Sequence, residues 1–323
     1  MALFTGLADA ELAELADRFE LGALHSGRAI PAGTINSNFE LTTERGRWFL
    51  RVNEGKSLAD VAWEAQLVAA LAARGVATPA PIAARDGLSY APLPGTDKWV
   101  SVFPWRGGHH LRPDEVTEAS AAALGAELAG LHRIGLELPV GWRRASIYDH
   151  AHLVARYAGV AASRDPALAR AIEVLGAELA AAGAAAGVRA RATHGIIHGD
   201  LFRDNVLWQG TSLVAILDFE QASGGSLAYD LAVCINDWCW TGGPRLDLAA
   251  ALLAGYQRVR PLAGDDREAL VIELPAAAAR FTLTRITDVY LANVPNPEKD
   301  FRAFLARCDA WRGPALGQLS SLL

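Results

Sequence analysis

The sequence lacks an excess of positive charge, a cysteine framework and a long hydrophobic run. Its formal net charge of -6 and isoelectric point near 5.8 argue against a nucleic-acid-binding protein, which needs a basic surface to displace phosphate counterions. Three cysteines, an odd number without C-x-x-C spacing, exclude a disulfide framework and a paired metal or redox site. No apolar stretch approaches the roughly 20 residues of a membrane span, and the N-terminus lacks the regions of a signal peptide. We therefore expect a cytoplasmic protein that binds neither nucleic acid nor membrane.

The length of 323 residues favours two domains or one bilobal domain. The first hundred residues predict a small antiparallel sheet with one long helix across it. A short helix is expected over 9–20 with Asp9 as its N-cap, followed by two strands around a polar turn at 44–47. A longer helix is expected from residue 58, with Leu58 on its buried stripe, and strand-like segments are expected over 81–90 and 98–105.

Pro104, Gly107 and Gly108 interrupt the last of these strands, as is typical of a hinge between lobes. We therefore expect an N-terminal lobe over 1–103 and a C-terminal lobe over 104–323. Helical periodicity dominates the second lobe. The expected helices are 114–133, 146–160, 165–183, 228–240, 246–258, 265–292 and 298–310.

One β-type interruption of this helical lobe, over 194–221, contains the polar stretch "HGDLFRDN". A hairpin of the segments "NVLW" and "SLVAILDFE" would return Asp218 close to Asn205, and Asp200 lies on the loop just before them. Two carboxylates and an amide, with no thiol, are ligands that suit a hard cation such as Mg²⁺. Because like charges so close repel strongly, we expect a metal that arrives with a polyphosphate.

"HGDLFRDN", followed thirteen residues after its Asn by "DFE", resembles the catalytic loop and metal-binding Asp of the protein-kinase-like fold. More narrowly, it resembles the aminoglycoside phosphotransferase and choline kinase superfamily. The resemblance implies an α+β bilobal fold and the transfer of the γ-phosphoryl group of ATP to the hydroxyl of a small metabolite. It further implies that Asp200 is catalytic and that Asn205 and Asp218 hold Mg²⁺. His198 and Asp230 are then structural supports of the loop.

The N-terminal lobe resembles the nucleotide-binding lobe of the same superfamily. The segment "PAGTINSNFEL" occupies the place of the loop over the ATP phosphates, and "WFLRV" resembles the strand that presents a phosphate-binding lysine. Arg51 stands at the lysine's position here, with Glu64 as its partner, since a guanidinium binds both carboxylate and phosphate oxygens. A surface arginine on an edge strand remains the alternative. The expected cofactor-binding residues are Gly33, Asn36, Ser37, Asn38, Arg51, Glu64, Ser101, Phe103 and Trp105.

Three groups of segments narrow the resemblance to bacterial homoserine kinases of this superfamily. They are "LFTGLADAELAELADRFELGAL" with "NSNF", "IIHGDLFRDNVLW" with "LAYDLAVCINDWCW", and "RFTLTRITD" with "KDFRAFL". The resemblance implies phosphorylation of L-homoserine to O-phospho-L-homoserine, a step of threonine biosynthesis. A kinase for an aminoglycoside, choline, a methylthio sugar or a protein hydroxyl, and a nucleotide-binding pseudokinase that acts as a scaffold, remain alternatives.

The helical spacing of Arg280, Thr284 and Asp288 would place a cation and an anion on one face, as the two ends of an amino acid require. An aminoglycoside is polycationic and would call for an acidic pocket instead. A solvated or structural ion pair explains the same spacing. The expected substrate-binding residues are Glu220, Asn236, Trp238, Arg280, Arg285 and Asp288. A buried helix with one polar face explains Asn236 and Trp238 equally well, and we expect His132 to be a core histidine.

Overall fold

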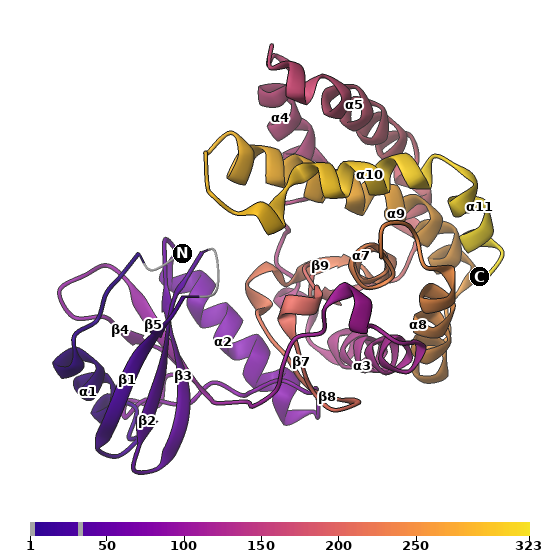
Figure 1. The fold of residues 1–323 in the computed structure, drawn as a ribbon. Helices are drawn as coiled ribbons and strands as arrows, with labels where there is room; N and C mark the ends of the chain where they lie inside the picture. Colours follow the sequence, from indigo (N-terminus) through magenta and orange to yellow (C-terminus); the bar gives the residue numbers. More distant parts are fainter. Residues whose placement is uncertain (1–3, 32–34) are drawn as a thin grey trace. The chain divides into compact units, whose positions relative to one another are not determined.

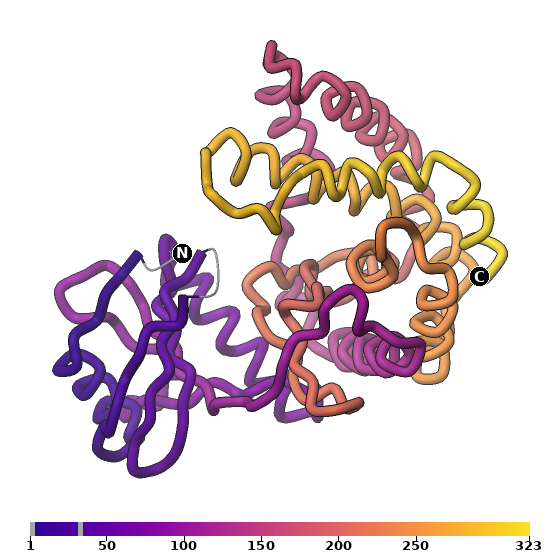
Figure 2. Tube along the Cα trace, viewed as in Figure 1, coloured from indigo at the N-terminus to yellow at the C-terminus, as the bar shows by residue number. Residues whose placement is uncertain are grey.

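The computed structural model describes residues 4–31 and 35–323. The chain forms two compact units, shown in Figure 1 and as a Cα trace in Figure 2. The N-terminal unit comprises Met1–His109 with Val214–Glu220, and the C-terminal unit comprises His110–Leu213 with Gln221–Leu323. A segment distant in the sequence, Val214–Glu220, therefore belongs to the N-terminal unit.

The N-terminal unit is built on a five-stranded antiparallel sheet in the order β1-β2-β3-β5-β4. Its elements are α1 (Asp9–Arg18), β1 (Leu24–Ile30), β2 (Ser37–Thr43), β3 (Gly46–Asn53), α2 (Leu58–Ala73), β4 (Ala91–Pro92) and β5 (Trp99–Pro104). Apolar side chains of α1, including Leu12 and Leu15, join Leu41, Leu50 and Val52 of the sheet in one core. The predicted sheet and long helix are confirmed, whereas β1 was not predicted.

Strand β3 follows the period-2 alternation of its sequence. Leu50 and Val52 are fully buried in the core, and Arg51 lies on the opposite face. Helix α2 begins after Ser57, whose side chain accepts a hydrogen bond from the Asp60 backbone N–H. It ends before Gly75, whose φ of 92° is the left-handed conformation that favours glycine.

Three local predictions in this unit were wrong. Ala8, and not Asp9, precedes α1, and the Glu11 carboxylate accepts the hydrogen bond of the Ala8 backbone N–H. Leu58 is 44% exposed because it is the first residue of α2 and points away from the face that the later turns bury. Residues 81–90 form turns around Gly87, and the strand that pairs with β5 begins only at Ala91.

The C-terminal unit is mainly helical, as predicted. Its α-helices are α3 (Glu118–Glu137), α4 (His150–Ala161), α5 (Ala169–Ala184), α6 (Ala186–Arg191), α7 (Leu227–Trp238), α8 (Leu246–Val259), α9 (Gly264–Arg285), α10 (Phe301–Trp311) and α11 (Pro314–Ser320). Helices α3 and α8 lie side by side in both views (Figures 1 and 2). Gly125 of α3 and Gly255 of α8 allow this close approach, because a Cβ at either position would collide with the backbone of the other helix.

Short strands hold the polar loop between the helices. β6 (His194–Ile197) pairs with β9 (Ser223–Ser226) in antiparallel register, and β7 (Val206–Gln209) forms a hairpin with β8 (Ser212–Ile216). The predicted hairpin is confirmed, whereas strand β9 was not predicted. Helix α9 ends at Arg285 and continues as a π-helical turn, Ile286–Tyr290.

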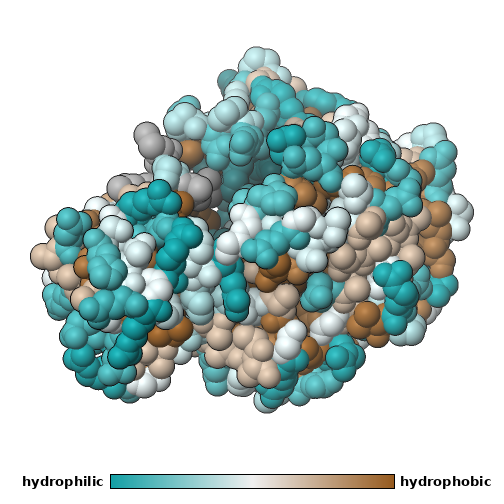
Figure 3. Space-filling model, turned by 60° about the horizontal axis from the view of Figure 1, so that its bottom comes forward, coloured by the Kyte–Doolittle hydropathy of each residue, from teal (hydrophilic) through white to brown (hydrophobic). Residues whose placement is uncertain are grey.

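Among the described residues, no helix is long and apolar enough to cross a membrane. The face drawn in Figure 3 mixes hydrophilic and apolar side chains. The cytoplasmic location remains a prediction.

Candidate active site

The loop after β6 is fastened to helix α7 by one buried carboxylate. Asp230 accepts hydrogen bonds from the backbone N–H groups of His198 (2.6 Å) and Gly199 (2.7 Å), and it contacts His132 Nε2 at 3.1 Å. Burial alone would raise the pKa of Asp230, but the hydrogen bond and charge of His132 hold it below its ordinary value. His132 is fully buried and also contacts the Tyr256 hydroxyl at 2.8 Å, as a satisfied core histidine does.

Asp200 follows this fixed point and lies beside a cation. Its Oδ1 is 3.6 Å from Nη1 of Arg280, and its carboxylate keeps 29% of its surface exposed. Its backbone carbonyl accepts a hydrogen bond of 2.7 Å from the Asn205 side-chain amide. This hydrogen bond therefore connects Asp200 and Asn205, the residues that the sequence assigns to catalysis and to metal binding, within one turn.

A buried ion pair holds the middle of the same loop. The Asp237 carboxylate accepts from the backbone N–H of Arg203 at 2.9 Å and from its Nε and Nη2 at 3.0 and 3.1 Å. Phe202 packs against the rings of Phe281 and Phe304, with ring centroids 4.5 and 5.6 Å away. Burial, and then the charges of Asp237 and Asp200, raise the pKa of the neighbouring Asp204.

The Arg280 guanidinium lies among aromatic rings, 3.8 Å from the Phe281 ring centroid and 4.0 Å from that of Tyr148. The side chain is 4% exposed, and its Nε is buried without a partner among the described residues. A guanidinium with an unused donor beside Asp200 fits a carboxylate of a substrate. Sequence reasoning missed Tyr148, because it is far from Arg280 in the chain and no motif marks it.

The prediction that Asp288 shares a helical face with Arg280 is wrong. Helix α9 ends at Arg285, and the wider π-helical turn that follows rotates Asp288 out of the α-helical spacing. The Asp288 carboxylate pairs with Arg156 at 2.6 Å. Arg285 donates to the Asp300 carbonyl at 3.2 Å and lies over the Phe304 ring.

Asn236 and Trp238, which were predicted to contact the acceptor, have completely buried side chains. The Asn236 amide donates to the carbonyls of Ala232 and Leu274 and accepts from Trp311 Nε1. Trp238 Nε1 donates to the carbonyl of Leu201 at 3.0 Å. The buried-helix alternative explains both residues.

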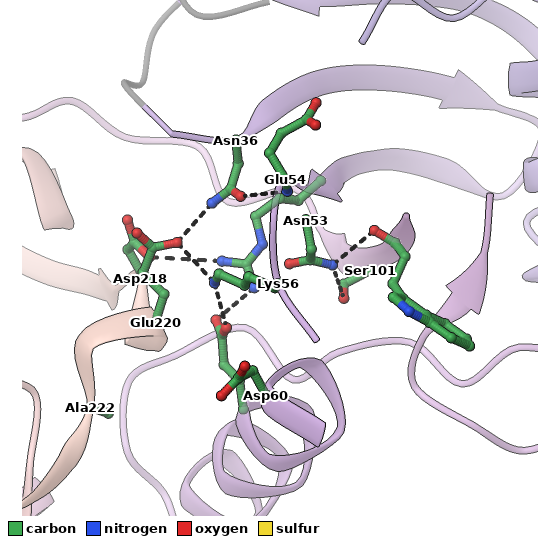
Figure 4. Close-up of polar contacts among 12 residues, drawn as sticks. Asn36, Asn53, Glu54, Lys56, Asp60, Ser101, Asp218, Glu220 and Ala222 are labelled. Carbon is green, nitrogen blue, oxygen red and sulfur yellow. Dashed lines mark hydrogen bonds and ion pairs between the residues drawn. The ribbon is translucent and has the colours of Figure 1, made fainter. Parts of the chain in front are cut away.

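The N-terminal unit contains the second half of the predicted site (Figure 4). Arg51 Nη2 is 2.6 Å from Glu64 Oε1, and its Nη1 is 3.7 Å from Asp218 Oδ1. The Arg51 side chain is 9% exposed and lies on β3, between β2 and β5, so the alternative of a surface arginine on an edge strand is wrong. Its Nε is buried without a partner among the described residues. Burial opposes ionisation of Glu64, yet Arg51 and Lys56 lower its pKa to about 2.

Glu220 belongs to this cluster, and its contact with the acceptor stays a prediction. Its Oε2 is 2.9 Å from Lys56 Nζ and 2.8 Å from the Asn36 side-chain amide. Burial and the Glu220 charge raise the pKa of Asp218 to about 7, although 40% of the Asp218 side chain is exposed and solvent screening reduces the associated energy. Asp218 has a φ of 61°, the left-handed conformation that aspartate tolerates better than most residues.

The remaining predicted cofactor residues are dispersed over β2 and β5, and Gly33 lies outside the described residues. Ser37 and Asn38 are part of β2 and not of a loop. The buried Ser37 hydroxyl accepts hydrogen bonds of 2.9 Å from the backbone N–H groups of Phe4 and Thr5, and the place of this segment over the phosphates stays a prediction.

Ser101, Phe103 and Trp105, the other expected cofactor-binding residues, lie on β5 or just after it. The Ser101 hydroxyl accepts from the Asn53 amide at 3.1 Å. The Phe103 ring centroid lies 5.6 Å from the Arg51 guanidinium carbon, and the Trp105 centroid 4.6 Å from that of Arg47.

Among the described residues, no group of three His, Cys, Asp or Glu side chains forms a metal cluster. This is compatible with the predicted set, because one of its two protein ligands is an asparagine. Asn205 and Asp218 belong to different units.

A small antiparallel sheet, a helical unit and a loop carrying Asp200 and Asn205 are features of a kinase-like phosphotransferase. A model of the phosphotransferase enzyme family matches residues 26–262 of this chain. The chain belongs to this family, and it is accordingly an ATP-dependent phosphotransferase.

Two curated relatives extend the similarity beyond that range. The chain is 35% identical over 298 residues to the homoserine kinase of Afipia carboxidovorans, covering 91% of this chain and 88% of that protein. It is 37% identical over 303 residues to the homoserine kinase of Xanthobacter autotrophicus, covering 91% and 90%.

Solved structures show the same fold at low identity. An amicoumacin kinase, in complex with AMP-PNP, Ca²⁺ and its ligand, has a TM-score of 0.71 at 14% identity and covers 97% of this chain and 94% of its own. A microcompartment-associated aminopropanol kinase has a TM-score of 0.67 at 21% identity and covers 98% and 100%. The predicted protein-kinase-like fold is confirmed.

Proposed function

We propose that the protein transfers the γ-phosphoryl group of ATP to the side-chain hydroxyl of L-homoserine, in the presence of Mg²⁺. The product would be O-phospho-L-homoserine, a precursor of threonine. One observation carries the proposal: homoserine kinases are 35% to 37% identical to this chain along about nine-tenths of its length. The similarity therefore extends over most of both chains and is not confined to one motif.

Arg280 supports an acceptor that carries a carboxylate. Its guanidinium is held between the rings of Tyr148 and Phe281, and one of its donors is unused. In this proposal Arg280 binds the carboxylate of homoserine and so places the substrate beside Asp200. The same buried cation disfavours a polycationic aminoglycoside by charge repulsion.

Asp200 is proposed to accept the proton of the acceptor hydroxyl. Its partly exposed carboxylate can receive a hydrogen bond from an incoming alcohol, and Asp230 and Asn205 hold the loop around it in place. Phosphoryl transfer depends mainly on positioning and on charge neutralisation. A fixed carboxylate that orients the hydroxyl therefore supplies much of what this half of the reaction requires.

The residues of the N-terminal unit fit a polyphosphate and a divalent cation. The unused Nε of Arg51 is a buried donor for a phosphate oxygen. Burial and the neighbouring Glu220 carboxylate raise the pKa of Asp218 to about 7, and a bound cation would offset this concentration of negative charge. We propose that Asn205 and Asp218 hold Mg²⁺, which neutralises phosphate charge when bound. The choice of these two ligands rests on the spacing of the two motifs along the chain. We propose that the N-terminal lobe, 1–103, binds the nucleotide and that the C-terminal lobe, 104–323, binds the acceptor. Asn36 and the segment from Ser101 to Trp105 are then part of the nucleotide site.

Identification of the product tests the proposal. The purified protein is incubated with ATP, Mg²⁺ and L-homoserine, and the products are examined by ³¹P NMR. Formation of a phosphomonoester of homoserine with stoichiometric ADP is expected, and it should stop when EDTA removes the metal. ADP formation only with an aminoglycoside or choline would favour those alternatives. ATP binding without turnover of any alcohol would favour a pseudokinase scaffold.

A further inference from the structure

The N-terminal unit contains a series of side chains of alternating charge (Figure 4). It runs from Asp218 to Arg51 at 3.7 Å and from Arg51 to Glu64 at 2.6 Å. Lys56 Nζ continues it, lying 3.1 Å from Glu64 Oε2 and 2.9 Å from Glu220 Oε2. Lys56 thereby connects helix α2, which carries Glu64, with the turn after β8, which carries Glu220.

The series holds three carboxylates and two cations, so it has one negative charge in excess. Four of its side chains are largely shielded from water, with exposed fractions of 9% for Arg51, 5% for Glu64, 15% for Lys56 and 7% for Glu220. Without Lys56, three carboxylates would face a single guanidinium. Charges a few ångströms apart in such surroundings interact strongly, and a bound polyphosphate would add further negative charge.

Lys56 also sets the orientation of its two carboxylate partners. Arg51 contacts Oε1 of Glu64 and Lys56 contacts Oε2, so the two cations together fix the rotation of that carboxylate. On Glu220, Lys56 and the Asn36 amide both contact Oε2. The position of the Arg51 guanidinium therefore depends on Glu64, which depends in turn on Lys56.

We propose that Lys56 is a positioning residue for the nucleotide: it neutralises Glu220 and orients Glu64, so that Arg51 is held ready for the phosphates of ATP. This inference rests on the proposed use of Arg51 as a phosphate-binding residue. It adds a second cation, outside the motifs of the sequence, to the nucleotide-binding machinery.

The sequence supplies a matched control. The chain has three lysines, Lys56, Lys98 and Lys299. Lys98 lies in the same unit and forms the same kind of ion pair, 2.7 Å from Glu54 Oε2. A general effect of removing a paired lysine from this unit would appear in both Lys56→Met and Lys98→Met, whereas the proposed role would appear in the first alone.

The experiment measures ATP binding by calorimetry without acceptor, and then KM and kcat for both substrates. Lys56→Met should weaken ATP binding at least about tenfold, and it should leave the KM for the acceptor within about twofold. Lys56→Arg should restore most of the affinity, and Lys98→Met should bind ATP like the wild type. The double variant Lys56→Met/Glu220→Gln should bind ATP more tightly than Lys56→Met, because the series then returns to the single excess negative charge of the wild type.

Circular dichroism and thermal unfolding check that each variant is folded. If Lys56→Met is unfolded, Lys56→Gln takes its place, since it keeps two hydrogen-bond donors but no charge, and the same loss is expected. Wild-type affinity in the folded neutral variant, or no recovery in Lys56→Arg and in the double variant, would overturn the inference. Failure of the wild type itself to bind ATP would instead overturn the proposed function.

Discussion

Arg280 Nη1 lies 3.6 Å from Asp200 Oδ1, and the Arg280 guanidinium is stacked near two aromatic rings. This arrangement places a fixed cation next to the carboxylate that the loop motif marks as catalytic. The cation can hold the Asp200 carboxylate in place and can also bind an anionic group of the acceptor. The two roles are separable by experiment.

Replacing Arg280 with Met should raise the KM for L-homoserine by about 10- to 100-fold, because a charge-assisted hydrogen bond contributes about 1.5 to 3 kcal/mol. The KM for ATP should change little. With 3-aminopropan-1-ol, which lacks the carboxylate, the variant and the wild type should differ much less. Arg170→Met, an exposed arginine paired with Glu173 and Asp309, serves as the control. Equal losses with both acceptors would show that Arg280 acts only through Asp200 and does not bind the carboxylate of the acceptor.

Replacing Asp200 with Asn should lower kcat by about 10² to 10⁴, the usual contribution of a positioned general base. ATP affinity, measured by calorimetry, should stay close to that of the wild type. Asp265→Asn, which changes an exposed carboxylate paired with Arg191, is the control. Turnover near the wild-type rate in Asp200→Asn would show that another group orients the hydroxyl.

Breaking the Arg203–Asp237 pair should destabilise the loop that carries Asp200 and Asn205. Asp237→Leu leaves a guanidinium that is only 18% exposed without its carboxylate, and we expect a loss of about 2 kcal/mol in urea unfolding together with a lower kcat. The double variant Arg203→Met/Asp237→Leu should regain part of the stability, because it removes both charges. Arg245→Met, which breaks an exposed pair with Asp247, should cost less than about 0.5 kcal/mol.

The buried Glu64 should make stability depend on pH in the acid range. Its pKa is about 2 in the folded state, against an ordinary value of 4.5, so the ionised form stabilises the fold above pH 4.5. That contribution is lost as the pH falls from 4.5 towards 2, and about 2 kcal/mol should disappear between pH 6 and pH 3.

Urea unfolding of the wild type and Glu64→Gln at both pH values measures this contribution. The stability difference between the two proteins should shrink by about 2 kcal/mol at the lower pH, whereas the difference for exposed Glu14→Gln should not change. A difference independent of pH would exclude Glu64 as the titrating group.

Local sequence signals predicted the parts of the site that lie on regular elements. The period-2 alternation of 48–53 placed Arg51 on the face opposite Leu50, and the expected Arg51–Glu64 ion pair forms at 2.6 Å. The hairpin of β7 and β8 was evident because two apolar runs flank the Gln209–Gly210 turn. In each case neighbouring residues decide the structure, so the pattern is readable without the fold.

Local sequence signals did not predict the parts of the structure that tertiary contacts determine. Strand β9 is Ser-Gly-Gly-Ser, a sequence with weak strand propensity, and it is extended because β6 pairs with it. Asp288 leaves the expected helical face because a π-helical turn replaces the last turn of α9. Tyr148 and Lys56 contribute through partners far from them in sequence, Arg280 and Glu220, and no spacing rule connects such pairs.

A competition assay tests the central claim most directly. L-Homoserine, 3-aminopropan-1-ol, choline and an aminoglycoside are mixed at equal concentrations with ATP, Mg²⁺ and the protein, and the phosphorylated products are quantified by mass spectrometry. The product ratios report the ratios of kcat/KM. We expect O-phospho-L-homoserine to exceed every other product by at least about tenfold, and Arg280→Met to reduce that preference over 3-aminopropan-1-ol. Preferential phosphorylation of the aminoglycoside or of choline would contradict the account.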